Sequence, residues 1–278
     1  MPNLKQFLFY EPLQKRHIVP LASATSIALA YIVFLVKGNA WVSIALYVVA
    51  AALILLLHKS VRRYLALLLV LTAVVSLTPL TTHPTLKGLA IVPTLMFGVV
   101  LLAYAVSRYM FREHLIHFRF DWHSKWQHWQ VGYLVFIVVG TYLLLPYYFA
   151  DTGAISGWYF ERNIGEIASI FTATLAIGIW EEFFFTATVL GVLQKYIPFV
   201  WANLLQASMF TAFLWKIGFH YWAGFGLFTY ALLQGWVFHK TRSLLYVLVI
   251  HVCVDLLVCL VLLNAYYADL VPIFITNL

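Results

Sequence analysis

Residues 167–193 read IASIFTATLAIGIWEEFFFTATVLGVL, an apolar and aromatic run that is interrupted by two adjacent glutamates, Glu181 and Glu182. The run is long enough to cross a bilayer, since a spanning helix needs about 20 predominantly apolar residues. A charged carboxylate at the centre of such a helix costs at least ~2.5 to 3.5 kcal/mol, so it persists where it lines a polar cavity or meets a partner. The glutamate pair is therefore the first place to look for function.

The rest of the chain has the same apolar character. Of its 278 residues, 64% are hydrophobic and 10% are charged, and the mean hydropathy is +0.91. The core of a soluble protein cannot bury that much apolar surface. We therefore predict an all-α, polytopic integral membrane bundle of about nine transmembrane helices. Charged or Pro/Gly-marked breaks delimit the expected spans, which are residues 19–36, 41–57, 64–80, 89–107, 131–149, 167–194, 198–217, 220–238 and 244–264.

The lysines and arginines predict the orientation of the bundle, because short cytoplasmic loops carry an excess of them. With a cytoplasmic N-terminus, only four of the 17 basic residues fall on the other side of the membrane, namely Lys37, Lys87, Arg162 and Lys216. An anionic lipid surface then accounts for the formal net charge of +7, and no basic stripe indicates a nucleic-acid partner.

Residues 107–130 read SRYMFREHLIHFRFDWHSKWQHWQ and mix arginine, histidine, tryptophan and phenylalanine. Such a mixture could indicate an RNA or ligand site. It is more typical of an amphipathic helix that lies in the headgroup layer with aromatic anchors, and we expect that structure here.

Most polar side chains within the expected spans lie in the C-terminal half of the chain. His251 and Asp255 are four residues apart, so they share one face of a helix. Counting ~1.5 Å per residue from the cytoplasmic helix ends, Glu181 lies about 20 Å and Asp255 somewhat over 15 Å into the membrane. Tilted helices could bring them to one depth. The other polar residues of this half are Gln206, Ser208 and Gln234.

Glu181, Glu182, His251 and Asp255 predict a common polar site. In the alternative arrangement, Asp255 merely holds His251, and the glutamates bond to groups of neighbouring helices. We divide the chain into N-terminal transmembrane helices and an interfacial segment, residues 1–164, as scaffold or partner surface. Residues 165–265 form the core that carries the site, and residues 266–278 form a C-terminal tail.

The order and spacing of the polar residues resemble the CAAX protease and bacteriocin-processing family, also called the Abi family. The run from Glu181 to Thr186 is similar to its first motif, EExxxR. The run from Lys240 to Leu244, followed by His251 and Asp255, is similar to its third motif, TGSL and then HxxxN or HxxxD. The resemblance covers about residues 165–265. Family members are polytopic intramembrane proteins, among them endopeptidases that remove the last three residues of prenylated proteins and others that process bacteriocins or exported peptides.

Two positions depart from the family pattern. Thr186 stands where the first motif has arginine, so Glu182 lacks its i, i+4 ion-pair partner. Leu214, four residues after Phe210, stands where the second motif, FxxxH, has histidine. A leucine can neither accept a proton nor bind a metal. His220 could replace the missing histidine if the chain folds back on itself.

The resemblance implies catalysis by Glu181, Glu182, His251 and Asp255. Glu181 would be the general base that activates a water molecule, and His251 with Asp255 would stabilise the tetrahedral oxyanion. No cofactor is expected. A zinc site made by Glu181, His251 and Asp255 ranks lower, because the missing histidine would also have been a ligand.

Three functions of different classes remain open. The first is an intramembrane glutamic endopeptidase that acts on a membrane-bound or lipidated peptide, with activity weakened by Leu214. The second is a catalytically inactive relative that binds, assembles or matures another membrane protein. A transporter is disfavoured, because the sequence has no inverted repeat and no paired Gly/Pro-broken helices. Expected partners are membrane lipids and a membrane-embedded or lipidated peptide or another membrane protein, and the resemblance with the charge pattern favours a bacterial inner membrane.

Overall fold

The computed structural model describes residues 11–79, 86–118, 120, 125–158 and 160–275, and all structural statements below concern these residues. They form helices and connecting segments. The helices are α2 (Lys15–Ile32), η1 (Val33–Lys37), α3 (Ala40–Leu55), α4 (Lys59–Leu77), α5 (Leu86–Ala105), η2 (Val106–Met110), α6 (His128–Thr152), η3 (Ala154–Trp158), α7 (Ile164–Glu181), η4 (Glu182–Leu190), α8 (Gly191–Tyr196), α9 (Phe199–Lys216), α10 (Ala223–Thr241) and α11 (Leu244–Tyr266).

The expected all-α membrane bundle is confirmed, and a helical rod lies over each expected span. By length and composition, six rods of the described chain can cross a membrane, and they cover Lys15–Lys37, Lys59–Leu77, Val92–Met110, His128–Thr152, Ile164–Tyr196 and Leu244–Tyr266. Helix α3 is apolar but shorter. The protein is thus an integral membrane protein, and the count of nine crossings stays a prediction.

Local sequence signals explain where several rods begin and end. The side chains of Asn39, Asn163 and Ser243 accept hydrogen bonds from backbone N–H groups in the first turns of α3, α7 and α11. Such caps satisfy donors that have no partner within the helix. Gly38 and Gly153 have φ angles of +63° and +64°, which glycine adopts at little cost, and they end η1 and α6.

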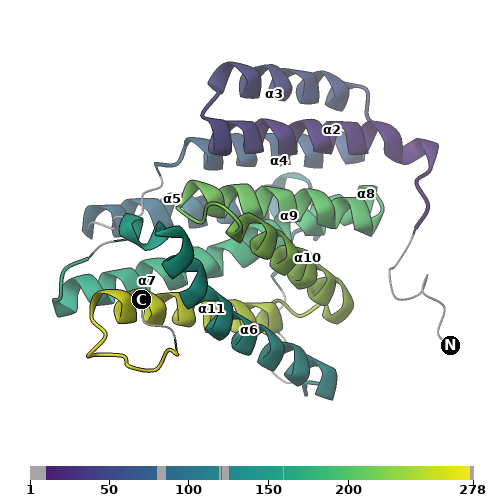
Figure 1. Cartoon of the computed structure of the whole chain (residues 1–278). Helices are drawn as coiled ribbons and strands as arrows, with labels where there is room; N and C mark the ends of the chain where they lie inside the picture. Colours follow the sequence, from purple (N-terminus) through teal and green to yellow (C-terminus); the bar gives the residue numbers. More distant parts are fainter. Residues whose placement is uncertain (1–10, 80–85, 119, 121–124, 159, 276–278) are drawn as a thin grey trace.

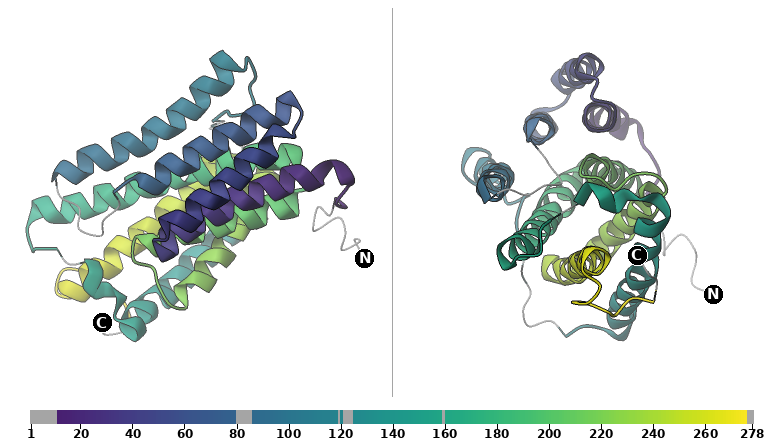
Figure 2. Two further views of the ribbon diagram at one scale, coloured as in Figure 1. Left: turned by 90° about the horizontal axis from the view of Figure 1, so that it is seen from above. Right: turned by 60° about the vertical axis from the view of Figure 1, so that its left-hand side comes forward.

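The early and late helices form two neighbouring groups (Figures 1 and 2). Figure 2 shows α2 to α5, coloured purple to blue, on one side of the helices that follow, coloured teal to yellow. Helix α2 packs against α3 and α9, and thereby joins the groups. In the second group α7 and α6 pack against α11, and α9 packs against α10.

Many basic residues meet at one end of the bundle. Arg63 at the start of α4 pairs with Glu113 after α5, and Lys195 at the end of α8 lies 3.7 Å from the same carboxylate. His239 near the end of α10 bonds to Gln194 of α8 at 2.7 Å. We call this end the basic end. It contains the starts of α4, α6 and α11 and the ends of α5, α8 and α10.

Other contacts define the opposite end. The hydroxyl of Tyr148 near the end of α6 accepts a hydrogen bond from the backbone of His220, in the α9–α10 connection, at 3.0 Å. Tyr266 at the end of α11 donates to the carbonyl of Ile155 in η3 at 2.7 Å. Arg162, just before α7, pairs with Asp269 of the C-terminal tail. Helix directions therefore alternate between the two ends.

The expected amphipathic helix over residues 107–130 is wrong. Helix η2 ends at Met110, and the described residues between it and α6 are not helical. Their aromatic side chains pack into the bundle instead of forming one lipid-facing stripe. The ring of Phe118 lies 4.7 Å from that of Phe183, and the ring of Trp126 lies 5.1 Å from that of Tyr246. Contacts with distant residues thus override the local pattern.

Candidate active site

The two glutamates lie at a change of helix type. Helix α7 ends at Glu181, and the π-helix η4 begins at Glu182. Within η4 the hydroxyl of Thr188 donates to the carbonyl of Phe183, five residues earlier, at 2.8 Å. A π-helical stretch is rare and often marks a functional site. Both glutamates are 2% exposed, so both carboxyl groups must find partners within the protein.

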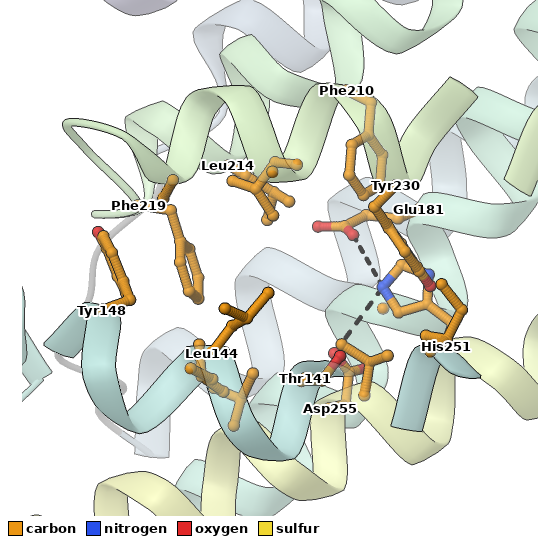
Figure 3. Close-up of a pocket in the computed structure, with 18 of the residues that line it drawn as sticks. Thr141, Leu144, Tyr148, Glu181, Phe210, Leu214, Phe219, Tyr230, His251 and Asp255 are labelled. Carbon is orange, nitrogen blue, oxygen red and sulfur yellow. Dashed lines mark ion pairs between the residues drawn. The ribbon is translucent and has the colours of Figure 1, made fainter. Parts of the chain in front are cut away.

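His251 of α11 is that partner for both glutamates. Its Nδ1 lies 2.7 Å from Glu182 Oε1, and its Nε2 lies 3.2 Å from Glu181 Oε2. Asp255 Oδ1, one turn further along α11, is 3.8 Å from the same Nε2 (Figure 3). The expected convergence of the four residues is therefore confirmed, and we call them the Glu–His–Asp cluster.

A glycine makes the approach of α7 to α11 possible. A Cβ added to Gly178 would lie 1.9 Å from Asp255 Oδ2 and 3.0 Å from His251 Cδ2. Any side chain at this position would force Asp255 to move, since real Cβ contacts are essentially never so short. Gly178 is one helical turn before Glu181, so the glycine and the glutamate together shape the surface that meets Asp255.

Gln234 extends the Glu–His–Asp cluster to α10 and α6. Its amide nitrogen is 3.3 Å from Glu182 Oε1 and 3.0 Å from the hydroxyl of Tyr230. Its amide oxygen accepts a hydrogen bond from Tyr133 of α6 at 3.4 Å. The sequence marks Gln234 as a polar residue of an expected span but assigns neither it nor the two tyrosines to the site. The i, i+4 spacing of Tyr230 and Gln234 was the signal that could have found one of them.

Three other expected polar residues lie apart from the Glu–His–Asp cluster. Gln206 is buried between α9 and α10, where a Cβ on Gly235 would be 3.2 Å from its Oε1. The hydroxyl of Ser208 bonds to the carbonyl of Leu204 in its own helix at 2.8 Å. The ring of His220 packs against Trp215, 5.1 Å away, so His220 does not take the place of the missing histidine.

A cavity of about 490 Å³ lies among α6, α7, α9, α10 and α11. Glu181, His251 and Asp255 line one end of it, and Tyr148 and Phe219 line the other (Figure 3). Its wall is otherwise largely apolar. Such a volume is typical of sites for small molecules or short peptide segments.

Leu214, where the resemblance leads us to expect the family's histidine, lies on the wall of this cavity and faces the same space as Glu181. The neighbouring Phe210 contacts His251, with 6.1 Å between ring centroids. Glu182 has a different place. It lies behind His251, between the imidazole and Gln234, and it is in position to hold the imidazole.

The two carboxyl groups on the cavity wall each have one oxygen without a hydrogen-bond partner among the described residues, Glu181 Oε1 and Asp255 Oδ2. A carboxylate beside an imidazole can take a proton from a water molecule that reaches it.

The residues do not fit the zinc alternative, because both ring nitrogens of His251 face carboxylates. The described part of the chain contains no group of three or more His, Cys, Asp or Glu arranged to hold a metal.

Comparison with known families identifies this region. The model of the family described as Type II CAAX prenyl endopeptidase Rce1-like matches residues 163–257. Comparisons with curated proteins and with solved structures gave no match. The matched residues run from the N-cap of α7 into α11 and include the whole Glu–His–Asp cluster. Residues 163–257 of this chain thus belong to the CAAX protease and bacteriocin-processing family.

Proposed function

We propose that the protein is an intramembrane glutamic endopeptidase that hydrolyses a membrane-bound or lipidated peptide. One observation carries the proposal. A carboxyl group, an imidazole and a second carboxyl group, from Glu181, His251 and Asp255, face a single largely apolar cavity within the bundle. Burying ionisable groups in a membrane costs free energy, so several such groups that line one cavity indicate a functional site.

In the proposed reaction Glu181 is the general base. It removes a proton from a water molecule, whose oxygen adds to the carbonyl carbon of the peptide bond. The proton then passes from Glu181 to the amide nitrogen, the carbon–nitrogen bond breaks, and a carboxylic acid and an amine leave. Such a positioned acid–base group typically contributes ~10² to 10⁴ in rate.

The other cluster residues act on the intermediate and on one another. His251 acts as an imidazolium in this proposal, because both of its ring nitrogens must donate. Its Nε2–H, which faces Glu181 at 3.2 Å, turns to the oxyanion, and Asp255 in its protonated form adds a second donor. Glu182 accepts from Nδ1 of His251 at 2.7 Å and holds the ring, and Gln234 holds Glu182. Glu182 is thus a positioning residue in this proposal.

Leu214 explains why we expect slow turnover. The family's histidine at this position shares the work of activating water with the first glutamate, and leucine removes that help. Its place on the cavity wall means that the lost group would have reached the same water. We therefore expect Glu181 to work alone, at a rate reduced by about 10² to 10⁴.

Peptide hydrolysis by purified protein in lipid nanodiscs tests the proposal. Lipidated and signal-bearing peptides are the substrates, and fragments are detected by mass spectrometry. The proposal expects cleavage by the wild type and background rates for Glu181→Gln. Glu166→Gln is the matched control, because Glu166 lies in the first turn of the same helix and outside the cavity lining. Cleavage that Glu181→Gln leaves unchanged would remove Glu181 from the base role.

Leu214 also favours a second candidate function, that of a catalytically inactive relative that assembles or matures another membrane protein. Helices α2 to α5 would then offer the partner surface, whereas in the first proposal α2 supports α9 and α5 supports α7 from outside. A wild type that never cleaves, and that co-purifies stoichiometrically with one membrane protein, would favour this role. For both functions we propose a bacterial inner membrane as the location, based on the family and the basic residues.

A further inference from the structure

The cavity extends from the Glu–His–Asp cluster in one direction only. On α6 its lining residues run from Phe136 to Tyr148, the part of the helix that leads to the opposite end. On α10 they run from Ala223 to Leu233, and the first turns of this helix start at that same end. Figure 3 shows the acidic residues at one extreme and Tyr148 with Phe219 at the other. The cavity thus points away from the basic end.

Side chains close the cluster toward the basic end. Glu182 and Gln234 lie behind His251, as described above. Phe183, the next residue along, packs against Phe118 and Phe120 of the α5–α6 connection, with centroids 4.7 and 5.9 Å apart. Phe118 and Phe120 thus cover Phe183, the residue of η4 next to Glu182, and the cavity lining does not continue past the Glu–His–Asp cluster toward the basic end.

The cavity opens sideways between α6 and α10. Phe136 and Leu144 of α6 line the cavity and yet are 66% and 59% exposed, and Phe225 of α10 is 79% exposed. A side chain can line a cavity and remain exposed only at its mouth. All three are apolar, so this mouth faces the hydrocarbon of the bilayer rather than water.

The basic residues indicate on which side of the membrane the mouth of the cavity lies. The basic end carries Arg63, Lys195 and Lys240, and the positive-inside pattern places that end in the cytoplasm. The portion of α6 and α10 that lines the cavity therefore lies in the middle and the non-cytoplasmic half of the bilayer.

Resting on the endopeptidase function proposed above, we propose that the substrate is a membrane-anchored peptide that enters from the non-cytoplasmic leaflet, through the mouth between α6 and α10. Its apolar segment occupies the cavity, and the bond to be cut reaches Glu181 from the non-cytoplasmic side. Peptides that cross or enter the membrane during export have this topology. A peptide anchored only in the cytoplasmic leaflet would meet the shielded end of the cluster.

Photo-crosslinking tests this access without requiring catalysis. In the test variant, a photoreactive phenylalanine analogue replaces Phe225 at the mouth. In the control variant it replaces Trp41, which is 83% exposed and belongs to α3, a helix distant from α10. The probe is a palmitoylated, charged peptide that stays in the leaflet to which it is added. Right-side-out membrane vesicles present the non-cytoplasmic leaflet to it, and inside-out vesicles present the cytoplasmic one.

We expect crosslinking at position 225 to be at least about tenfold stronger in right-side-out vesicles, and excess unlabelled peptide to suppress it, as for a saturable site. Crosslinking at position 41 should not be suppressed by competition. Equal crosslinking from both leaflets, stronger crosslinking from the cytoplasmic one, or no competition at position 225 would overturn the proposal.

The same samples separate this proposal from the proposed activity. When Glu181→Gln is introduced into the position-225 variant, the crosslinking at position 225 should remain, because peptide binding does not require the general base. Crosslinking that persists without any cleavage would support the access route and contradict the peptidase. Conversely, Glu181-dependent cleavage of a probe offered only from the cytoplasmic leaflet would support the peptidase and overturn the access route.

Discussion

Gly178 and Asp255 are in direct contact across the α7–α11 interface, and a methyl group on Gly178 would lie 1.9 Å from Oδ2 of the aspartate. The contact places a carboxyl group on the wall of the cavity, 3.8 Å from the imidazole of His251. The geometry of the Glu–His–Asp cluster therefore depends on the absence of a side chain at position 178.

Gly178→Ala should displace Asp255 and lower kcat by about 10²-fold, since a shift of 1 Å at a reacting centre can have that effect. Alanine favours a helix over glycine by up to ~1 kcal/mol, so the helix itself should not unfold. Peptide cleavage and a thermal unfolding curve measure the two effects. Gly191→Ala is the control, because a Cβ there meets nothing within 4 Å. Equal activity of the two variants would contradict the role given to Gly178.

Gln234→Leu should lower kcat more than it changes KM, because Gln234 contacts Glu182 behind His251 rather than the substrate space. Losing the hydrogen bonds of a buried amide should destabilise the protein by about 1 to 3 kcal/mol. Gln206→Leu is a matched control, as it removes a buried glutamine of α9 that lies apart from the cluster. Steady-state kinetics of both variants decide the point, and a kcat that falls equally in both would show a purely structural effect.

Asp255→Asn should retain much of the activity, whereas Asp255→Ala should lose about 10² to 10³ in kcat, the usual cost of losing one oxyanion donor. The reason is that asparagine keeps a donor at the same place, and the third family motif accepts either residue. Kinetics with one peptide substrate compare the variants. If Asp255→Asn were as inactive as Asp255→Ala, the carboxyl group would have another task than donation to the oxyanion.

The sequence predicted much of this architecture because membrane burial leaves a simple signal. Apolar runs separated by charged breaks located the helical rods, and the i, i+4 spacing of His251 and Asp255 placed both on one face. The depths of Glu181 and Asp255 differ by a few ångströms, which helix tilt can remove, and they then indicated the convergence that the structure confirms. These signals are local or depend only on distance along a helix.

Other features depend on contacts between distant residues, so the sequence could not supply them. The π-helix at Glu182, the close approach at Gly178 and the direction of the cavity all result from how α7 packs against its neighbours. The structure of residues 107–130 differs from the predicted amphipathic helix for the same reason. Its amphipathic composition fits the headgroup layer, yet Phe118 finds a partner in Phe183.

Leu214→His should raise the cleavage rate by about 10² or more, because it returns a proton acceptor to the wall that Glu181 shares. Leu205→His is the control, since it adds a histidine to the same helix at a position outside the cavity lining. Fluorogenic peptide hydrolysis in nanodiscs measures the gain. An unchanged rate would contradict the alignment of Leu214 with the family's histidine.

The most direct measurement is the effect of Glu181→Gln in the faster Leu214→His background. Both proteins are reconstituted in the same lipid and given the same peptide, and the fragments are followed by mass spectrometry. If Glu181 activates the water, the double variant falls to the uncatalysed rate while its thermal stability stays close to that of Leu214→His. Cleavage that continues undiminished without the Glu181 carboxylate would contradict the account.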